Sequence, residues 1–422
     1  MMNQSRCLAI RRNAVSLTTL GIVSSLVAAL AACSSHGGAS GDSQSSKSGS
    51  STSSPIIVGS YYQGTGTQNA YPEVGPALQA AVQYVNNDLG GVGGHPLKLV
   101  TCVTDGTPTS TQNCAQELVS KKPAIVVNGY DQNDAVANKI IGGAGIVTVA
   151  ESAGTLAADA DPMVYYLSGS PGTVAVGLAA SVLAVNPNAK HVAELVPDVP
   201  VFGSIVDTVK TVLADKGVEL NVVKFPASSA DLSQAWVSLR ADKQDTVLLT
   251  VDPGHCLAAI KAAKLQQSRT PVISFPFCAS ADIVRQTGNA TDGWLVQTAS
   301  ADPGGDDPDA VIYRAQMAKF DKNANAGGFA PQAFPVLMMA YEILKAAGYD
   351  KLSADSIRQA ARAGGPIFMG GGQRFKCETD PAFPAICSFG LTLGKVSGDK
   401  YAIQSQYTVD TQELFDKYVK SK

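Results

Sequence analysis

Aromatic and polar side chains are concentrated in short segments that follow apolar runs of the sequence. Such side chains bind small organic molecules, because rings provide apolar contact area and hydroxyl, amide or carboxylate groups orient the ligand. The alternative for each ring is that it only packs the edge of a domain, and the alternative for Asp131 is that it caps the helix predicted to follow. The candidate ligand-binding residues are Tyr71, Tyr130, Asp131, Gln132, Ser152, Thr155, Phe202, Asp252 and Phe277.

The catalytic and nucleotide-binding motifs that the sequence approaches are all incomplete. The stretch 390–396 is one residue short of a P-loop, the stretch 168–172 lacks the first glycine of a nucleophile elbow, and the stretch 64–66 lacks the third glycine of a dinucleotide fingerprint. A serine hydrolase that uses Ser170 with His191 or His255 is the enzymatic alternative, and a turnover assay tests it. We predict a binding protein that is not an enzyme and uses no cofactor.

The chain has eight cysteines, of which six lie beyond residue 33 and fall into three close pairs. Pairing within each close pair needs only local loops. A metal site is the alternative, but the sequence has no C-x-x-C pair and only His255 adjoins a cysteine, so no metal is predicted. The predicted disulfides join Cys102 with Cys114, Cys256 with Cys278, and Cys377 with Cys387.

The N-terminus has the layout of an export signal. Three arginines within the first twelve residues precede an apolar run from Ala14 to Ala32. The end of this run, Leu30-Ala31-Ala32-Cys33, resembles the bacterial lipobox, whose cysteine is acylated, palmitate included, and becomes the first mature residue. A retained transmembrane helix is the alternative. We predict a signal peptide over 1–32, a lipidated Cys33 with a Ser/Gly-rich tether over 33–54, and a lipid-anchored protein on the extracytoplasmic face of the cell membrane.

The rest of the chain must place the candidate residues at the ends of strands. Short β-branched runs alternate with longer Ala/Leu/Val segments of helical period, which is typical of parallel sheets covered by helices. Two such series predict two open sheets, whose ligands bind outside the carboxyl ends of the strands. The net charge of −3 argues against nucleic acid as a partner. The predicted strands are 56–61, 97–103, 124–128, 146–149, 191–196, 220–225, 246–251, 272–275 and 295–299, with helices at 74–88, 110–120, 133–142, 204–215 and 256–265.

Several segments resemble the leucine-binding type of ABC-transporter substrate-binding protein. They are Pro55-Ile56-Ile57-Val58-Gly59, Ala80-Ala81-Val82-Gln83-Tyr84-Val85-Asn86, and the glycine turn Gly90-Gly91-Val92-Gly93-Gly94-His95-Pro96-Leu97 before the second strand. The resemblance covers nearly all of 55–422, a late helix at 333–347 included. It implies the type I periplasmic-binding-protein fold, an α/β fold with two doubly wound open-sheet lobes joined by a hinge that the chain crosses three times. The implied lobe 1 is 55–168 and 301–393, and the implied lobe 2 is 169–300 and 394–422.

The same resemblance implies a monomer that captures a small solute between its lobes and delivers it to the permease and ATPase subunits of an ABC importer. A ligand sensor that is not coupled to transport is the alternative. In the family's amino-acid binders a serine after the third strand holds the ligand carboxylate and an acidic residue in lobe 2 holds the ammonium group. These positions fall here on Asp131 and near Phe277, so a branched-chain amino acid fits poorly. The expected ligand is an amino acid or another small polar or aromatic solute, with a cationic, amide or hydroxyl group at Asp131.

Overall fold

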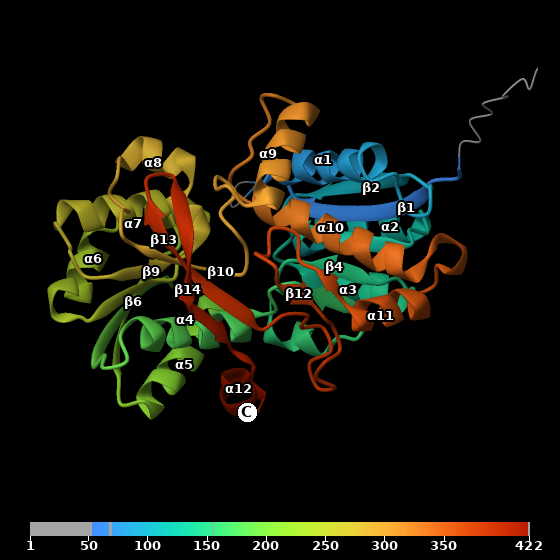
Figure 1. Ribbon diagram of the computed structural model, residues 1–422. Helices are drawn as coiled ribbons and strands as arrows, with labels where there is room; N and C mark the ends of the chain where they lie inside the picture. Colours follow the sequence, from blue (N-terminus) through green and yellow to red (C-terminus); the bar gives the residue numbers. More distant parts are fainter. Residues whose placement is uncertain (1–52, 67–69, 154, 421–422) are drawn as a thin grey trace, which may run out of the picture. The chain divides into compact units, whose positions relative to one another are not determined.

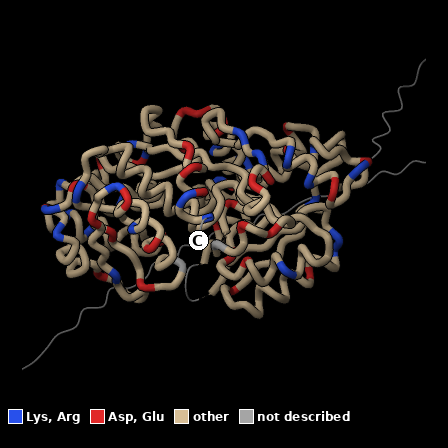
Figure 2. The backbone as a smooth tube through the Cα atoms, turned by 90° about the horizontal axis from the view of Figure 1, so that it is seen from below, with Lys and Arg blue, Asp and Glu red and all other residues tan. Residues whose placement is uncertain are grey.

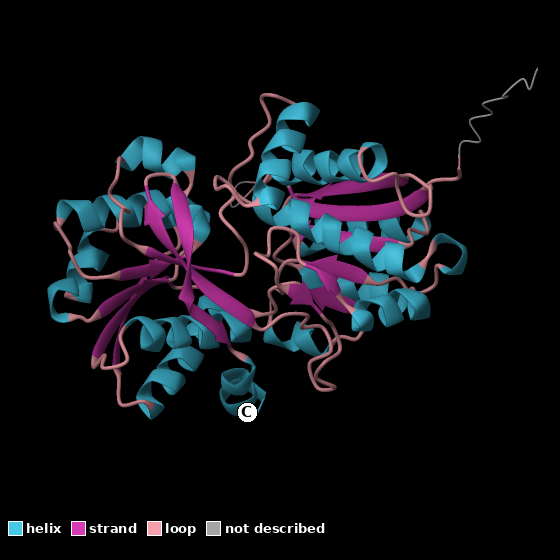
Figure 3. Cartoon of the chain, in the orientation of Figure 1, coloured by secondary structure: helices cyan, strands magenta, loops and turns pink. Residues whose placement is uncertain are grey.

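The computed structural model describes residues 53–66, 70–153 and 155–420. These residues belong to one compact unit, Thr52–Lys422, which contains two large sheets with helices on both faces (Figures 1 and 3). The predicted signal peptide, Cys33 and nearly all of the tether lie outside the described residues. Within the described ranges, no helix has the length and apolar character needed to cross a membrane.

The first lobe is built on a five-stranded sheet whose strands are all parallel. Its elements are β1 (Ile56–Gln63), α1 (Val74–Asn87), β2 (Leu97–Thr104), α2 (Pro108–Ser120), β3 (Ile125–Tyr130), α3 (Asp134–Gly143), β4 (Thr148–Ala150), η1 (Leu156–Ala160), β5 (Val164–Tyr166), α9 (Pro308–Phe320), α10 (Ala330–Ala347), η4 (Tyr349–Lys351), α11 (Ala354–Ala363), β11 (Gly365–Pro366) and β12 (Arg374–Phe375). The strand order is β2-β1-β3-β4-β5. One face of the sheet packs against α1, α10 and α11, and the other against α2 and α3. Burial of both faces explains the nearly continuous apolar character of these strands.

The second lobe is built on a seven-stranded sheet, with two antiparallel strands at one edge. Its elements are α4 (Pro171–Val185), β6 (His191–Pro197), α5 (Pro200–Asp215), β7 (Glu219–Phe225), α6 (Ser233–Leu239), η2 (Ala241–Lys243), β8 (Thr246–Leu249), α7 (Pro253–Leu265), β9 (Val272–Ser274), η3 (Pro276–Ala279), α8 (Ala281–Thr287), β10 (Leu295–Thr298), β13 (Gly390–Ser397), β14 (Lys400–Asp410), α12 (Gln412–Phe415) and η5 (Asp416–Lys420). The strand order is β14-β13-β10-β9-β8-β6-β7. Helices α4 and α5 cover one face, and α6 and α7 cover the other.

The chain passes between the two lobes three times, after β5, after β10 and after β12. The predicted fold class, α/β with two doubly wound lobes, is therefore confirmed. At the level of single residues the lobe boundaries stay a prediction. Strand β13 already belongs to the second sheet from Gly390 on, four residues before the predicted return at 394.

Proline is the first residue of five α-helices. Because proline has no N–H group and its φ is preset, it fits a position where the backbone donor has no partner in any case. The predicted helix starts at 204 and 256 were late because the helices begin at these prolines instead. The five residues are Pro108, Pro171, Pro200, Pro253 and Pro308.

Three disulfides join the cysteines in the predicted pairs. Cys102–Cys114 ties β2 to α2, and Cys256–Cys278 ties the first turn of α7 to η3. Cys377–Cys387 closes a loop beside β5, where Tyr166 receives a hydrogen bond from the backbone N–H of Cys387. Each disulfide links local loops within one lobe, as the spacing suggested.

Charged residues are interspersed over both lobes. Figure 2 shows lysine and arginine alternating with aspartate and glutamate along the backbone rather than gathering into one stripe. In the part of the chain that the structure describes, no group of three or more His, Cys, Asp or Glu side chains is arranged to hold a metal ion.

Candidate ligand-binding site

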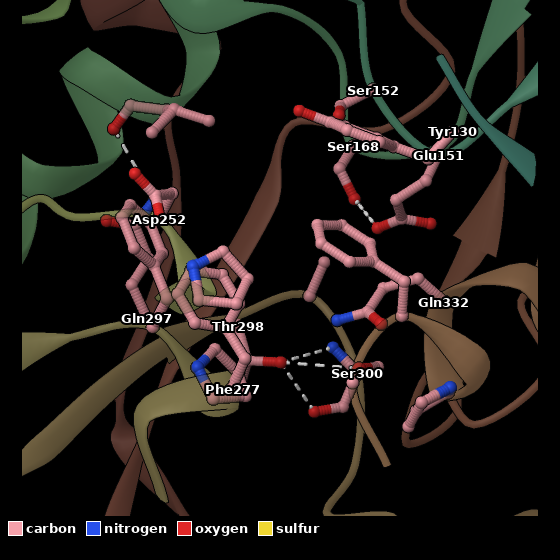
Figure 4. A pocket seen from close by; sticks show the side chains of 18 of the residues that line it. Tyr130, Glu151, Ser152, Ser168, Asp252, Phe277, Gln297, Thr298, Ser300 and Gln332 are labelled. Atoms are coloured by element: carbon pink, nitrogen blue, oxygen red, sulfur yellow. Dashed lines mark hydrogen bonds between the residues drawn. The ribbon is translucent and has the colours of Figure 1, made fainter. Parts of the chain in front are cut away.

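A cavity of ≈1520 Å³ is lined by residues of both lobes, at the carboxyl ends of the strands of both sheets. It is larger than the roughly 300–1,000 Å³ of a typical small-molecule site, so a solute leaves room for water. Figure 4 shows Glu151, Ser152 and Ser168 on one side and Asp252, Phe277 and Gln297 across from them.

Most of the predicted ligand-binding residues line this cavity. These residues could be predicted from the sequence because each follows a strand or a turn. Parallel sheets bring such segments, although distant in the sequence, to the same edge. The two exceptions are Asp131 and Thr155. The residues that line it are Tyr71, Tyr130, Gln132, Ser152, Phe202, Asp252 and Phe277.

Asp131 does not face the cavity, which corrects its predicted role as a ligand-binding residue. Its side chain is buried, with 3% of its surface exposed, and its carboxylate receives hydrogen bonds from the hydroxyl groups of Thr104 (2.5 Å) and Thr111 (3.0 Å). The backbone N–H of Asn133 also donates to it, at 2.8 Å, directly before α3. Asp131 therefore fixes the start of α3 against β2 and α2. This role resembles the predicted alternative, in which Asp131 caps the helix that follows.

Thr155 is exposed and directly precedes η1, and its side chain makes no capping hydrogen bond there. It is not among the residues that line the cavity. The loop after β4 therefore contributes its first residues to the cavity wall, Ser152 among them, and then turns away into η1.

The first lobe supplies a cluster of three rings, Tyr71, Tyr130 and Phe329. The ring centroids of Tyr71 and Tyr130 lie 5.1 Å apart, those of Tyr71 and Phe329 lie 4.5 Å apart, and those of Tyr130 and Phe329 lie 4.6 Å apart. Phe277 of the second lobe approaches Phe329 to 6.3 Å and Phe275 to 5.5 Å. These distances are typical of interacting aromatic pairs, so the rings form an apolar wall that spans both lobes.

Tyr130 is held in an unusual backbone conformation. Its φ is +135°, in a region that disfavours residues with a Cβ atom, and the side chain of Asn128 accepts a hydrogen bond from its N–H at 3.0 Å. Strained residues persist where the surrounding structure fixes them, often at functional sites. Burial raises the pKa of the Tyr130 hydroxyl to about 12, and nearby acids add to this, so the hydroxyl stays neutral and able to donate.

The sequence did not indicate Phe329 as a cavity residue. It follows Gly327 and Gly328, directly before α10, and its N–H donates to the carboxylate of Glu73 at 2.9 Å. Gly328 has φ +59°, and a Cβ atom there would collide with the Glu73 carboxylate. A ring after two glycines at the start of a helix was the signal that could have marked this position.

Glu151, which directly follows β4, is not among the predicted ligand-binding residues. It is partly buried, lines the cavity, and receives a hydrogen bond from the hydroxyl group of Ser168. Burial raises the pKa of its carboxyl group to about 7, while the hydrogen bond from Ser168 opposes that shift.

The wall of the second lobe is fixed by Asp252 and His255. The Asp252 carboxylate caps α7 by accepting from the N–H of Gly254 at 2.9 Å, and it contacts His255 Nδ1 at 2.7 Å. His255 Nε2 lies 3.0 Å from the backbone oxygen of Ala227. Ser170, the nucleophile of the hydrolase alternative, caps α4 by accepting from the N–H of Gly172. Ser170 and His255, two residues of the hydrolase alternative, therefore have structural partners.

A sequence model described as periplasmic binding protein matches residues 55–382, which is most of the chain. The chain belongs to the periplasmic binding protein family. The leucine-binding resemblance is thereby confirmed at the level of the family, as is its type I fold. No curated protein matches the chain.

Several solved structures share the fold at low sequence identity. A fatty acid ABC transporter substrate-binding protein from Thermomonospora curvata has a TM-score of 0.71 at 15% identity, over 86% of this chain and 94% of that one. A solute-binding protein of an ABC transporter from Rhodopseudomonas palustris, in complex with 3,4-dihydroxybenzoic acid, has a TM-score of 0.68 at 19% identity, over 84% and 98%. A leucine-binding protein from Thermotoga maritima has a TM-score of 0.65 at 14% identity, over 83% and 97%.

Proposed function

We propose that this protein captures a small organic solute between its two lobes and delivers it to an ABC importer from the extracytoplasmic side of the membrane. The observation that carries the proposal is the cavity at the strand ends of both sheets, because its aromatic wall includes Phe329 from one lobe and Phe277 from the other. A solute that contacts both walls favours the approach of the lobes, since it binds that arrangement better than an open one.

The solutes named for the similar structures are a fatty acid, a dihydroxybenzoic acid and leucine, and each has an apolar body. The rings of Tyr71, Tyr130 and Phe329 suit such a body, because aromatic side chains bury large apolar areas with little loss of rotamer freedom. The proposal includes the lipid anchor at Cys33, which would keep the captured solute near the membrane.

The test is mass spectrometry of small molecules released when protein purified from its native host is denatured. We expect one solute at close to one molecule per chain. The same measurement is made on the variant Phe329→Ala, which lacks one ring of the cavity wall. This variant should release at least about tenfold less solute than the wild-type protein. Small-angle scattering should then show that the added solute makes the wild-type protein more compact. A wild-type protein that releases no solute and binds none added would contradict the proposal, and turnover of the solute would favour the hydrolase.

A further inference from the structure

The carboxyl group of Glu151 is placed to contact a ligand. Ala150, the residue before it, pairs in register with Asn128, so Glu151 and Tyr130 emerge from the ends of neighbouring strands. Figure 4 shows the two side chains close together at the cavity wall. Among the described residues, Ser168 is the hydrogen-bond partner of the carboxyl group and bonds to Oε1, which leaves Oε2 to the cavity.

Of the three basic side chains that line the cavity, His255 and Arg314 are hydrogen-bonded within the protein, and Lys400 is exposed. Arg314 donates to the backbone oxygens of Pro303 (2.6 Å) and Gly305 (2.7 Å), and Lys400 is exposed on the rim, where its charge acts on Asp302. The ionisable side chains that line the cavity are the acids Glu151, Asp252, Asp282, Asp302 and Asp399, the bases His255, Arg314 and Lys400, and the tyrosines Tyr71, Tyr130, Tyr313 and Tyr401. Acids outnumber bases, so the lining disfavours an anionic ligand group at Glu151.

On this basis we propose that Glu151 determines the specificity of the site by accepting a hydrogen bond from an ammonium group of the ligand. The solute is then a small organic amine with an aromatic or apolar body, which packs against Tyr130 and Phe329. This inference rests on the proposed function and names its substrate class. Aromatic faces attract cations as well as apolar groups, so the rings and the carboxylate favour the same ligand.

The protonation of Glu151 determines whether ligand affinity rises or falls with pH, which experiments can check. With a pKa of about 7 in the empty cavity, the group is mostly protonated at pH 6 and mostly ionised at pH 8. An ammonium ligand should therefore bind more tightly as the pH rises, by up to about tenfold per pH unit below the pKa, and a carboxylate ligand should bind less tightly. Tyr71, Tyr130, Asp252 and His255 are among the titratable groups that line the same cavity as Glu151.

The experiment is calorimetry with benzylamine, benzyl alcohol and benzoate, three probes with the same ring. At pH 8 we expect benzylamine to bind most tightly and benzoate at least about tenfold more weakly. Glu151→Gln keeps an oxygen that can accept from Ser168 but removes the charge, so it should weaken benzylamine by at least tenfold and leave benzyl alcohol within about threefold. The matched control is Glu117→Gln, the same substitution at an exposed position of α2 that does not line the cavity, which should change benzylamine affinity by less than twofold.

Wild-type protein measured at pH 6 and pH 8 provides a test that does not depend on whether the variant folds. A pH dependence that persists in Glu151→Gln would assign the effect to a group other than Glu151 and overturn the proposal. Benzoate binding more tightly than benzylamine, or a bound native solute with a carboxylate and no ammonium group, would overturn it while leaving solute capture intact. Absence of both a native solute and probe binding would overturn the proposed function as well.

Discussion

Replacing Asp131 by alanine separates a role in folding from a role in ligand binding. The carboxylate is buried and receives hydrogen bonds from Thr104, Thr111 and the N–H of Asn133, at 2.5, 3.0 and 2.8 Å. A hydrogen bond to a charged group contributes about 1.5–3 kcal/mol, and part of this is recovered when the hydroxyl groups rearrange. We therefore expect Asp131→Ala to lower the free energy of unfolding by about 2–4 kcal/mol, measured by denaturant titration followed by circular dichroism.

The neighbouring residue Gln132 is the matched control. It lines the cavity, it is exposed, and its side chain donates to the backbone oxygen of Gly106 at 2.9 Å. Gln132→Ala should change the free energy of unfolding by less than about 0.5 kcal/mol. Ligand affinity, measured by calorimetry with the native solute, should stay within about twofold for folded Asp131→Ala. If Asp131→Ala instead keeps its stability and loses affinity, the carboxylate faces the ligand and our reasoning is refuted.

Three further substitutions test other parts of the structure. Gly328→Ala places a methyl group against a carboxylate at a positive φ, so it should lower stability by about 1–3 kcal/mol and weaken solute binding; full retention of both would show that the loop adapts freely. Glu194 is fully buried and burial raises its pKa to about 7, so the folded state holds a proton that the unfolded state loses, and stability falls as the pH rises from about 4.5 to 7. Glu194→Gln should remove up to about 3 kcal/mol of this fall between pH 5 and pH 8, and an equal effect of the mutation at both values would refute the assignment. Cys33→Ala should release the protein from membranes or leave an uncleaved precursor, and normal processing with normal membrane attachment would contradict the anchor.

The sequence predicted strands β1–β4 and β6–β10, the disulfide pairs and seven residues of the cavity wall because these depend on local signals. Alternation of β-branched and helical segments marks the strands, and in parallel sheets the residue that follows a strand lies at a known edge. The antiparallel pair β13 and β14 was missed, although Gly398 and Asp399 form a two-residue turn between these strands. That segment had been compared with a P-loop instead.

The two errors at the site have separate physical causes. Asp131 was expected in the cavity because it follows β3, but the positive φ of Tyr130 redirects the chain, and a tyrosine gives no sequence signal for that conformation. Phe329 was missed because its position depends on Glu73, a residue 256 positions earlier in the chain. Local patterns contain no information about such a contact, since it forms only when the chain returns from the second lobe.

The two walls of the cavity are fixed independently before any ligand binds. In the first lobe Asn128 holds Tyr130 and Glu73 holds the backbone of Phe329, while in the second lobe the Cys256–Cys278 disulfide anchors η3, which contains Phe277. Because these rings are already held, a ligand loses little by ordering them, and under the proposed function its binding energy remains available to bring the lobes together. The hydrogen bond from Ser168 orients Glu151 in the same way. The affinity of the site therefore depends on how well a solute matches two rigid walls, and its selectivity depends on the few polar groups between them.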